Sequence, residues 1–196
     1  MATEFIYLVI NNLSSMNVSV KDILRLPGQG EKTHSDMVIK ARAEDMAGDF
    51  SVMEGHINPN EIIAPHTHDH EAQLVYVITG ELEFEVGGEG GLRFAAPAGS
   101  YILKPKGVMH TFWNKKNIVS RYIELSGRNY FEGFVDSKAN GTVHTLTHAK
   151  NHGMTTHMKD TVRLMAKHGL TGLSSMELPR LPQLPEWTRK LINNKK

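Results

Sequence analysis

The chain has no cysteine among its 196 residues. This absence excludes disulfides, zinc fingers, iron–sulfur clusters and thiol nucleophiles, so any metal ion must be held by histidine, carboxylate or amide groups. The chain also lacks an excess of one charge, because 22 lysines and arginines stand against 21 aspartates and glutamates, a formal net charge of +1. Such a balance offers no general attraction for nucleic acid, and we expect no nucleic-acid partner.

Long hydrophobic runs are missing as well. The apolar run at residues 5–10 is too short for a membrane span or a secretory signal, and no basic residue precedes it. We therefore expect a cytoplasmic protein with no membrane partner. The hydrophobic fraction of 40% and the charged fraction of 22% are typical of a soluble globular protein. This length fits one domain with elaborations at either end.

Three regions differ in their pattern. Residues 1–37 mix apolar and turn-forming residues and are predicted to be an N-terminal arm. Residues 38–125 hold short apolar or alternating runs separated by Gly, Pro and Asn, which predicts an all-β barrel or sandwich. The clearest strand lies at residues 81–87, where Leu82, Phe84 and Val86 share one face, and a glycine-rich hairpin loop follows it.

Residues 126–196 are predicted to form a helical and extended C-terminal extension. A helix is expected over residues 160–168, with an apolar stripe of Val162, Met165 and Ala166 and an end at Gly169. The prolines at 179, 182 and 185 recur every third residue, which favours an extended strap followed by a short terminal helix.

Histidines gather in one short stretch of the predicted barrel. His66 and His68 are two residues apart, so on a strand they point to the same side and can bind one ion. Gln73 has the opposite parity and joins them only if the chain turns between Asp69 and Ala72. The pair by itself also fits histidines that merely decorate the surface.

A second segment provides a third imidazole. Pro105 and Gly107 predict a turn that starts a strand with His110, Phe112 and Asn114 on one side. His110 taken alone also fits a buried histidine of the core, and Phe112 with its neighbour Trp113 fits either core or the lining of a binding site. The two segments together predict convergence of three histidines on one ion.

The two segments resemble the linked motifs of the cupin superfamily. The first cupin motif has a His-x-His pair followed by a glutamate and a glycine, and the second runs Gly, five residues, Pro-x-Gly, two residues, His, three residues, Asn. The positions that fit at full spacing are His66, His68, Gly80, Gly99, Pro105, Gly107, His110 and Asn114. The opening glycine of the first motif is absent, and Gln73 stands where most cupins have the glutamate.

The resemblance implies a double-stranded β-helix, or jelly-roll, barrel that holds one divalent metal ion through His66, His68, Gln73 and His110. The metal could be Fe, Ni, Mn, Co or Zn. The length and the helical tail resemble the single-barrel, quercetin-dioxygenase-like cupins. The glutamine resembles instead the ligand set of cupins that open unsaturated uronates and of cupin hydroxynitrile lyases.

The amide changes the chemistry of such a site. A neutral amide oxygen cannot act as a base and leaves the ion a stronger Lewis acid than a carboxylate would, which favours an anionic or enolised substrate. His70 and Glu71 are therefore the candidate catalytic acid–base residues, although both could simply face water. A second cluster, His144, His148 and His152, is spaced for one helix face, but the surrounding threonines and glycines disfavour a helix there.

The leading hypothesis is a metal-dependent enzyme acting on a small molecule with an enol, carbonyl or hydroxyl group. Its reaction is either a dioxygenation or a Lewis-acid lyase, isomerase or cyclase reaction. The alternative is a non-catalytic cupin module that binds a small ligand. We expect a homodimer, since the resemblance implies it and the apolar N-terminal run could add to a partner's sheet.

Overall fold

The computed structural model of the chain describes residues 19–33, 37–137 and 145–174. The predicted proline strap, the terminal helix, the apolar run at residues 5–10 and His144 lie outside the described residues. The chain divides into residues 1–30 and residues 31–196. In the first unit the structure describes one short helix, α2 (Val20–Ile23), whose start is capped by Asp22 through a 2.6 Å hydrogen bond from the Ser19 amide.

The second unit contains two β-sheets, in which the strands pair antiparallel except for the parallel pair of β13 and β4. In spatial order, the first sheet consists of β1 (Glu31–Lys32), β2 (Val38–Ala41), β3 (Phe50–Ile57), β11 (Ser120–Gly127), β6 (Gln73–Thr79) and β9 (Tyr101–Lys104). The second consists of β12 (Met154–Thr156), β5 (His66–His68), β10 (His110–Trp113), β4 (Glu61–Ile62) and β13 (Gly172–Leu173). The hairpin of β7 (Glu81–Val86) and β8 (Leu92–Pro97) pairs with β10, and a 3-10 turn covers Glu44–Met46.

The alternating strand patterns bury one face of each sheet against the other. Leu82 and Phe84 of β7 are buried as predicted, and Val86 pairs with Leu92 across the predicted glycine-rich hairpin. Glu85 is buried as well, because Arg93 and Arg163 neutralise its carboxylate. The main core lies between the sheets and includes Met53, Ile57, Val75, Val77, Leu82, Phe84, Ile102, Phe112 and Tyr122. The predicted all-β class is confirmed.

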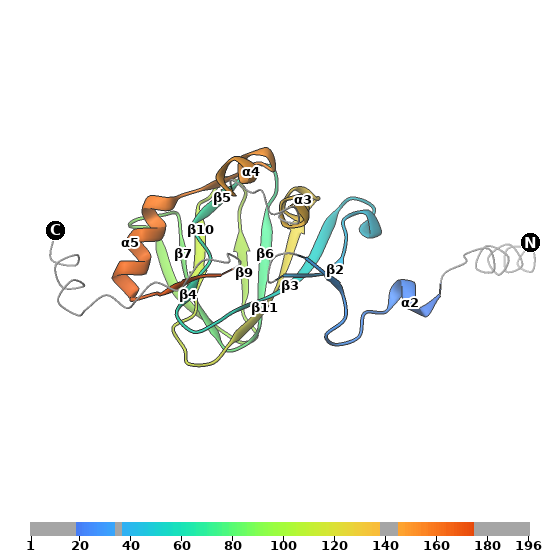
Figure 1. The fold of residues 1–196 in the computed structure, drawn as a ribbon, viewed down its shortest axis with the longest axis horizontal. Helices are drawn as coiled ribbons and strands as arrows, with labels where there is room; N and C mark the ends of the chain where they lie inside the picture. The colour runs from blue at the N-terminus through green and yellow to red at the C-terminus, as the bar shows by residue number, and fades with distance from the viewer. Residues whose placement is uncertain (1–18, 34–36, 138–144, 175–196) are drawn as a thin grey trace, which may run out of the picture. The chain divides into compact units, whose positions relative to one another are not determined.

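The C-terminal region adds both helices and strands. Strands β12 and β13 pair with β5 and β4, so this region extends the second sheet. Helix α5 (Met158–His168) packs on the outer face of the same sheet, beside β7 and β4 in Figure 1. It ends at Gly169, whose φ of 61° is the left-handed conformation predicted for the end of this helix.

The predicted apolar stripe of α5 is wrong in one respect. Val162 is 65% exposed, whereas Leu164 is fully buried beside Met165 and Trp113. The buried positions of this helix are Thr161, Leu164 and Met165, the spacing of one helical face, so the packing surface is rotated from the predicted one.

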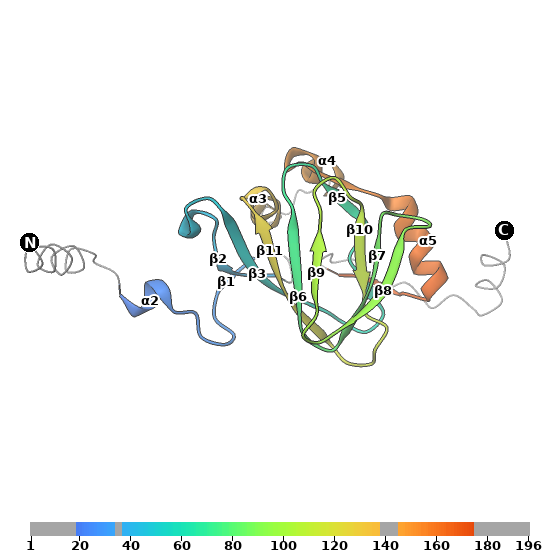
Figure 2. The ribbon, with the colours of Figure 1, turned by 180° about the vertical axis from the view of Figure 1, so that it is seen from behind.

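Helix α4 (Thr145–Asn151) forms where the sequence disfavoured a helix. Ala149 is fully buried in the main core, and burial of this face outweighs the weak helix propensity of the threonines. Helices α3 (Tyr130–Ser137) and α4 lie at the end of the barrel where β5 begins its turn into β6, as both opposite views show (Figures 1 and 2). Among the described residues, no helix is both long and apolar enough to cross a membrane.

Candidate metal centre

Three buried histidines from two strands meet inside the barrel. Strand β5 carries His66 and His68, and strand β10 carries His110, which is the antiparallel partner of His66. One ring nitrogen from each lies within 4.8 Å of the other two. The two motifs predicted to converge are therefore brought together by the pairing of β5 with β10.

Backbone carbonyl groups orient two of these rings. The Nδ1–H of His66 donates to the Ala64 carbonyl at 2.7 Å, and the Nδ1–H of His110 donates to the Val108 carbonyl at 2.9 Å. This assignment leaves the Nε2 atom of each ring as a lone-pair acceptor. These two Nε2 atoms lie 3.1 Å apart, and Nε2 of His68 is buried without a hydrogen-bond partner.

Two facing Nε2 lone pairs repel each other unless a proton or a metal ion lies between the rings. A proton is disfavoured, because burial lowers the pKa of His66 to about 3 and the pKa values of His68 and His110 well below their usual range. A metal ion fits, since imidazole nitrogens bind at about 2.1 Å and two neighbouring ligands on one ion then lie about 3.0 Å apart in octahedral or about 3.4 Å apart in tetrahedral geometry. The three histidines could therefore hold a metal ion.

Gln73 lies at the start of β6, after the bend at Asp69 and His70 that the sequence permitted. Its side-chain Nε2 donates to the Ser126 hydroxyl at 2.8 Å. Its Oε1 atom is buried and has no hydrogen-bond partner. The oxygen of this amide is therefore the atom left for an ion or a ligand, and its role as a metal ligand stays a prediction.

The two candidate acid–base residues lie in different surroundings. His70 is exposed and packs against the Tyr130 ring, with ring centres 4.6 Å apart. Glu71 is buried, and its Oε1 accepts a 2.7 Å hydrogen bond from the Phe131 amide at the start of α3. The same oxygen lies 3.7 Å from Nδ1 of His68, on the opposite side of that ring from Nε2. Burial raises the pKa of Glu71 to about 7 against the lowering effect of backbone amides.

This placement puts Glu71 between His68 and the start of α3. Its carboxylate contacts the ring nitrogen that does not face the other two histidines, and it connects the histidine to α3. A catalytic role for His70 or Glu71 stays a prediction.

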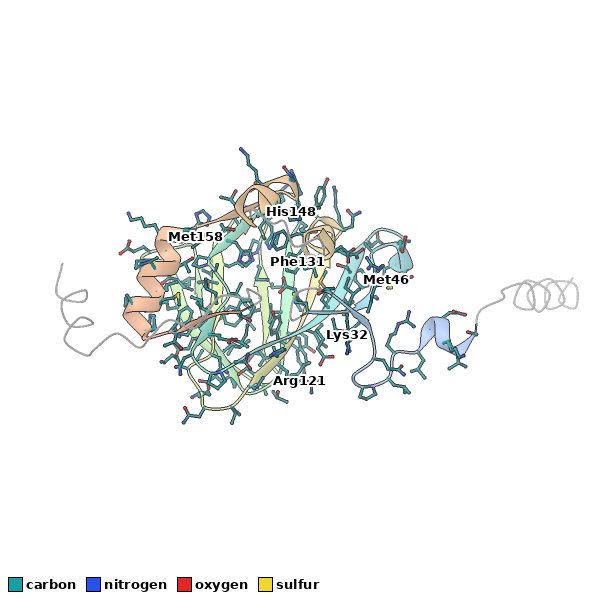
Figure 3. All side chains as sticks on the ribbon, viewed as in Figure 1. Lys32, Met46, Arg121, Phe131, His148 and Met158 are labelled. Carbon is teal, nitrogen blue, oxygen red and sulfur yellow. The ribbon has the colours of Figure 1, made fainter. Side chains whose placement is uncertain are left out.

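Aromatic residues surround the histidines on the side of α3. The ring of Phe131 lies edge-on to His68 with centres 5.3 Å apart, and Phe134 continues the stack towards His148. Figure 3 shows Phe131 beneath His148 at this end of the barrel. Phe112 and Trp113 are core residues, and the indole of Trp113 donates to Glu83 on the side covered by α5.

The second histidine cluster is partly realised. His148 lies on α4 and His152 just after it, with ring centres 4.8 Å apart, and both rings pack on Phe134. Within the described ranges, the three barrel histidines alone form a group of three or more side chains with the spacing of metal ligands.

Sequence reasoning missed a buried ion pair. Lys104 of β9 and Glu124 of β11 are both buried, and the Lys104 ammonium donates to the Glu124 carboxylate at 2.7 Å. Strand parity could have revealed the buried lysine, because Lys104 shares a face with buried Ile102 while Tyr101 and Leu103 are exposed.

Residues 53–125 match the model of the cupin domain family. Together with the two opposed sheets, this confirms the predicted jelly-roll class. No curated protein matches the chain in sequence.

Several solved structures are similar in fold. A protein from Bacillus halodurans has 20% identity and a TM-score of 0.40, with 41% of this chain and 64% of that chain covered. KdgF from Halomonas sp. has 22% identity and a TM-score of 0.42, with 47% and 76% covered. A predicted oxalate decarboxylase from Thermotoga maritima has 19% identity and a TM-score of 0.46, with 54% and 98% covered. The chain thus spans less than two thirds of the Bacillus protein.

Proposed function

We propose that this chain is a metal-dependent enzyme of the single-barrel, quercetin-dioxygenase-like type, and that its substrate is a small organic molecule with an enol, carbonyl or hydroxyl oxygen. His66, His68, His110 and Gln73 hold one divalent ion. The observation that carries the proposal is the pair of Nε2 atoms of His66 and His110, which face each other at 3.1 Å while both Nδ1 atoms bind carbonyl groups.

The donor set favours Lewis-acid chemistry. The ion would supply positive charge for an oxygen atom of the substrate, and three neutral imidazoles and an amide do not reduce that charge. The set lacks the carboxylate of the two-histidine, one-carboxylate centre common in non-heme iron oxygenases. We therefore favour a lyase or isomerase reaction over a dioxygenation.

The chain's own residues do three things in this proposal. The carbonyl groups of Ala64 and Val108 hold two imidazoles in the neutral form that binds a metal ion. Glu71 positions His68 from the Nδ1 side. The apolar core below and the Phe131 ring beside His68 shield the site from water, which strengthens electrostatic interactions there.

The test is metal stoichiometry. The purified wild-type chain is expected to contain about one divalent ion, measured by mass spectrometry of the metals, and His110→Ala is expected to lose it. His56→Ala is the matched control, because His56 lies on β3 outside the triad. Metal loss in both variants, or no metal in the wild type under metal-replete growth, would contradict the proposal and leave a metal-free ligand-binding module.

The identity of the ion then decides the reaction class. Zinc directs the search to lyase and isomerase substrates assayed without oxygen. Iron, nickel or manganese directs it first to oxygen uptake with flavonols and diketones, where consumption of oxygen would overturn our preference for a non-oxidative reaction.

A further inference from the structure

A row of polar side chains crosses the inner wall of the first sheet. Ser51 of β3 pairs with Ser126 of β11, Ser126 pairs with Gln73 of β6, and Gln73 pairs with Lys104 of β9. These four strands lie side by side in the sheet (Figure 2). Cross-strand partners share a face, so the side chains form one continuous row. All four residues are at most 4% exposed.

The row faces the interior of the barrel. The next positions on the same face of these strands include Met53, Val75 and Ile102, all members of the main core. Lys104 extends further inward, since its ammonium lies 5.7 Å from the centre of the Phe112 ring on the opposite sheet. Gln73, as the predicted fourth metal ligand, would connect the row to the candidate metal centre.

Two atoms of the row have unmet hydrogen-bonding capacity. Ser51 Oγ and Gln73 Oε1 are buried without a hydrogen-bond partner. Buried polar groups nearly always have partners, so Ser51 Oγ, which can donate, indicates a ligand or ordered water in the interior, whereas Gln73 Oε1 can only accept and is the proposed metal ligand. The Lys104 ammonium has three donors, and one of them goes to Glu124.

The charges of the interior favour an anion. Glu124 neutralises Lys104, but the three imidazoles and the amide leave the charge of a bound ion unbalanced. An anionic ligand between the ion and Lys104 would restore the balance in a region of low dielectric.

A gain in folding stability does not explain the buried ion pair of Lys104 and Glu124. A buried ion pair typically contributes no more to stability than two well-packed apolar side chains in the same place. The barrel interior is otherwise rich in such side chains, so an apolar pair at positions 104 and 124 would serve the core equally well. Lys104 belongs to the same row as Gln73, and a charged pair at this place is better explained by ligand binding.

We propose that the row Ser51, Ser126, Gln73 and Lys104 is a binding site for a carboxylate group, with Lys104 held by Glu124 as its charged anchor. The substrate class is then a small carboxylic acid with a second oxygen that reaches the metal centre. This inference rests on the proposed function for the metal contact, although the carboxylate contact to Lys104 is a property of the row itself.

The test compares lactate with its uncharged analogue lactamide. Both are titrated by calorimetry into zinc-loaded wild-type chain and into a Lys104→Met, Glu124→Leu double variant that replaces the ion pair with apolar side chains of similar size. The wild type is expected to prefer lactate, and the double variant to lose about tenfold of that preference while it still binds zinc. If this variant fails to fold, the titrations use the double variant Lys104→Gln, Glu124→Gln instead, which keeps a hydrogen bond between the two positions.

The outcomes separate this inference from the metal centre. An unchanged preference for lactate in a folded double variant would overturn the carboxylate site while the metal centre stands. If the wild type binds no zinc, the proposed function fails and the titrations are made on the metal-free chain. Lactate binding that the double variant loses would then support the carboxylate site, and equal or absent binding in both would overturn it.

Discussion

The Nε2 atoms of His66 and His110 face each other at 3.1 Å in the barrel interior. Each ring is oriented by the backbone carbonyl group two residues before it in the chain, just ahead of its strand. Local hydrogen bonds therefore fix the orientation of both rings, with their Nε2 atoms facing each other. The predicted fourth donor, Gln73, and the surrounding charges depend on contacts with other strands, and these can be tested one at a time.

Gln73→Met is expected to weaken metal binding by about tenfold or more, because it replaces the free amide oxygen with a thioether of similar size. Gln73→Glu is expected to strengthen it, because a carboxylate adds negative charge beside the ion. Competition with a chelator measures both affinities. If Gln73→Met bound metal as tightly as the wild type, Gln73 would not be a ligand.

Glu71→Ala is expected to lower the free energy of unfolding by about 1–2 kcal/mol, because the Phe131 amide at the start of α3 loses its acceptor. Glu71→Gln keeps an acceptor oxygen and should lose less. Hydrogen exchange of the α3 amides measures the local effect, with the exposed loop variant Glu89→Ala as the control. Equal protection of α3 in the wild type and Glu71→Ala would disprove this anchoring role.

Lys104→Met alone is expected to lower the free energy of unfolding by about 3–5 kcal/mol, because the Glu124 carboxylate stays buried without its partner. The double variant with Glu124→Leu is expected to be within about 1 kcal/mol of the wild type. Denaturant unfolding of the three proteins measures the differences. A single variant as stable as the double variant would show that Glu124 does not need the lysine.

His168 predicts a pH dependence of stability. Burial, followed by the positive charges of Arg93, Lys167, Lys115 and Arg163, lowers the pKa of His168 from 6.5 to about 4. Between these values the unfolded chain binds a proton that the folded chain does not, so the free energy of unfolding falls as the pH falls from 6.5 to about 4.

His168→Gln is expected to flatten this part of the profile, measured by denaturant unfolding of metal-free protein at each pH. The neighbouring ring of Trp113, 4.8 Å from His168, gives a fluorescence signal for the same transition. An identical pH profile in wild type and variant would rule out the contribution of His168.

Several features could be predicted from residue spacing. The parity of His66 and His68, the turn before His110 and the alternation of Leu82 and Phe84 each depend on a few consecutive residues, and each appears as predicted. The helix over residues 145–151 and the packing face of α5 were mispredicted. Both depend on burial of Ala149 and Leu164 against distant strands, which outweighs local preference.

The sequence by itself determined the all-β class and the three histidines, because strand periodicity and ligand spacing are local properties of the chain. Only the tertiary structure decided what stands around them. Glu71 turned to the Nδ1 side of His68, His70 stayed exposed, and Lys104 met Glu124 across β6. Strand pairing decides these contacts, because it brings the charged groups of Glu71, Lys104 and Glu124 into the barrel interior from different strands and turns.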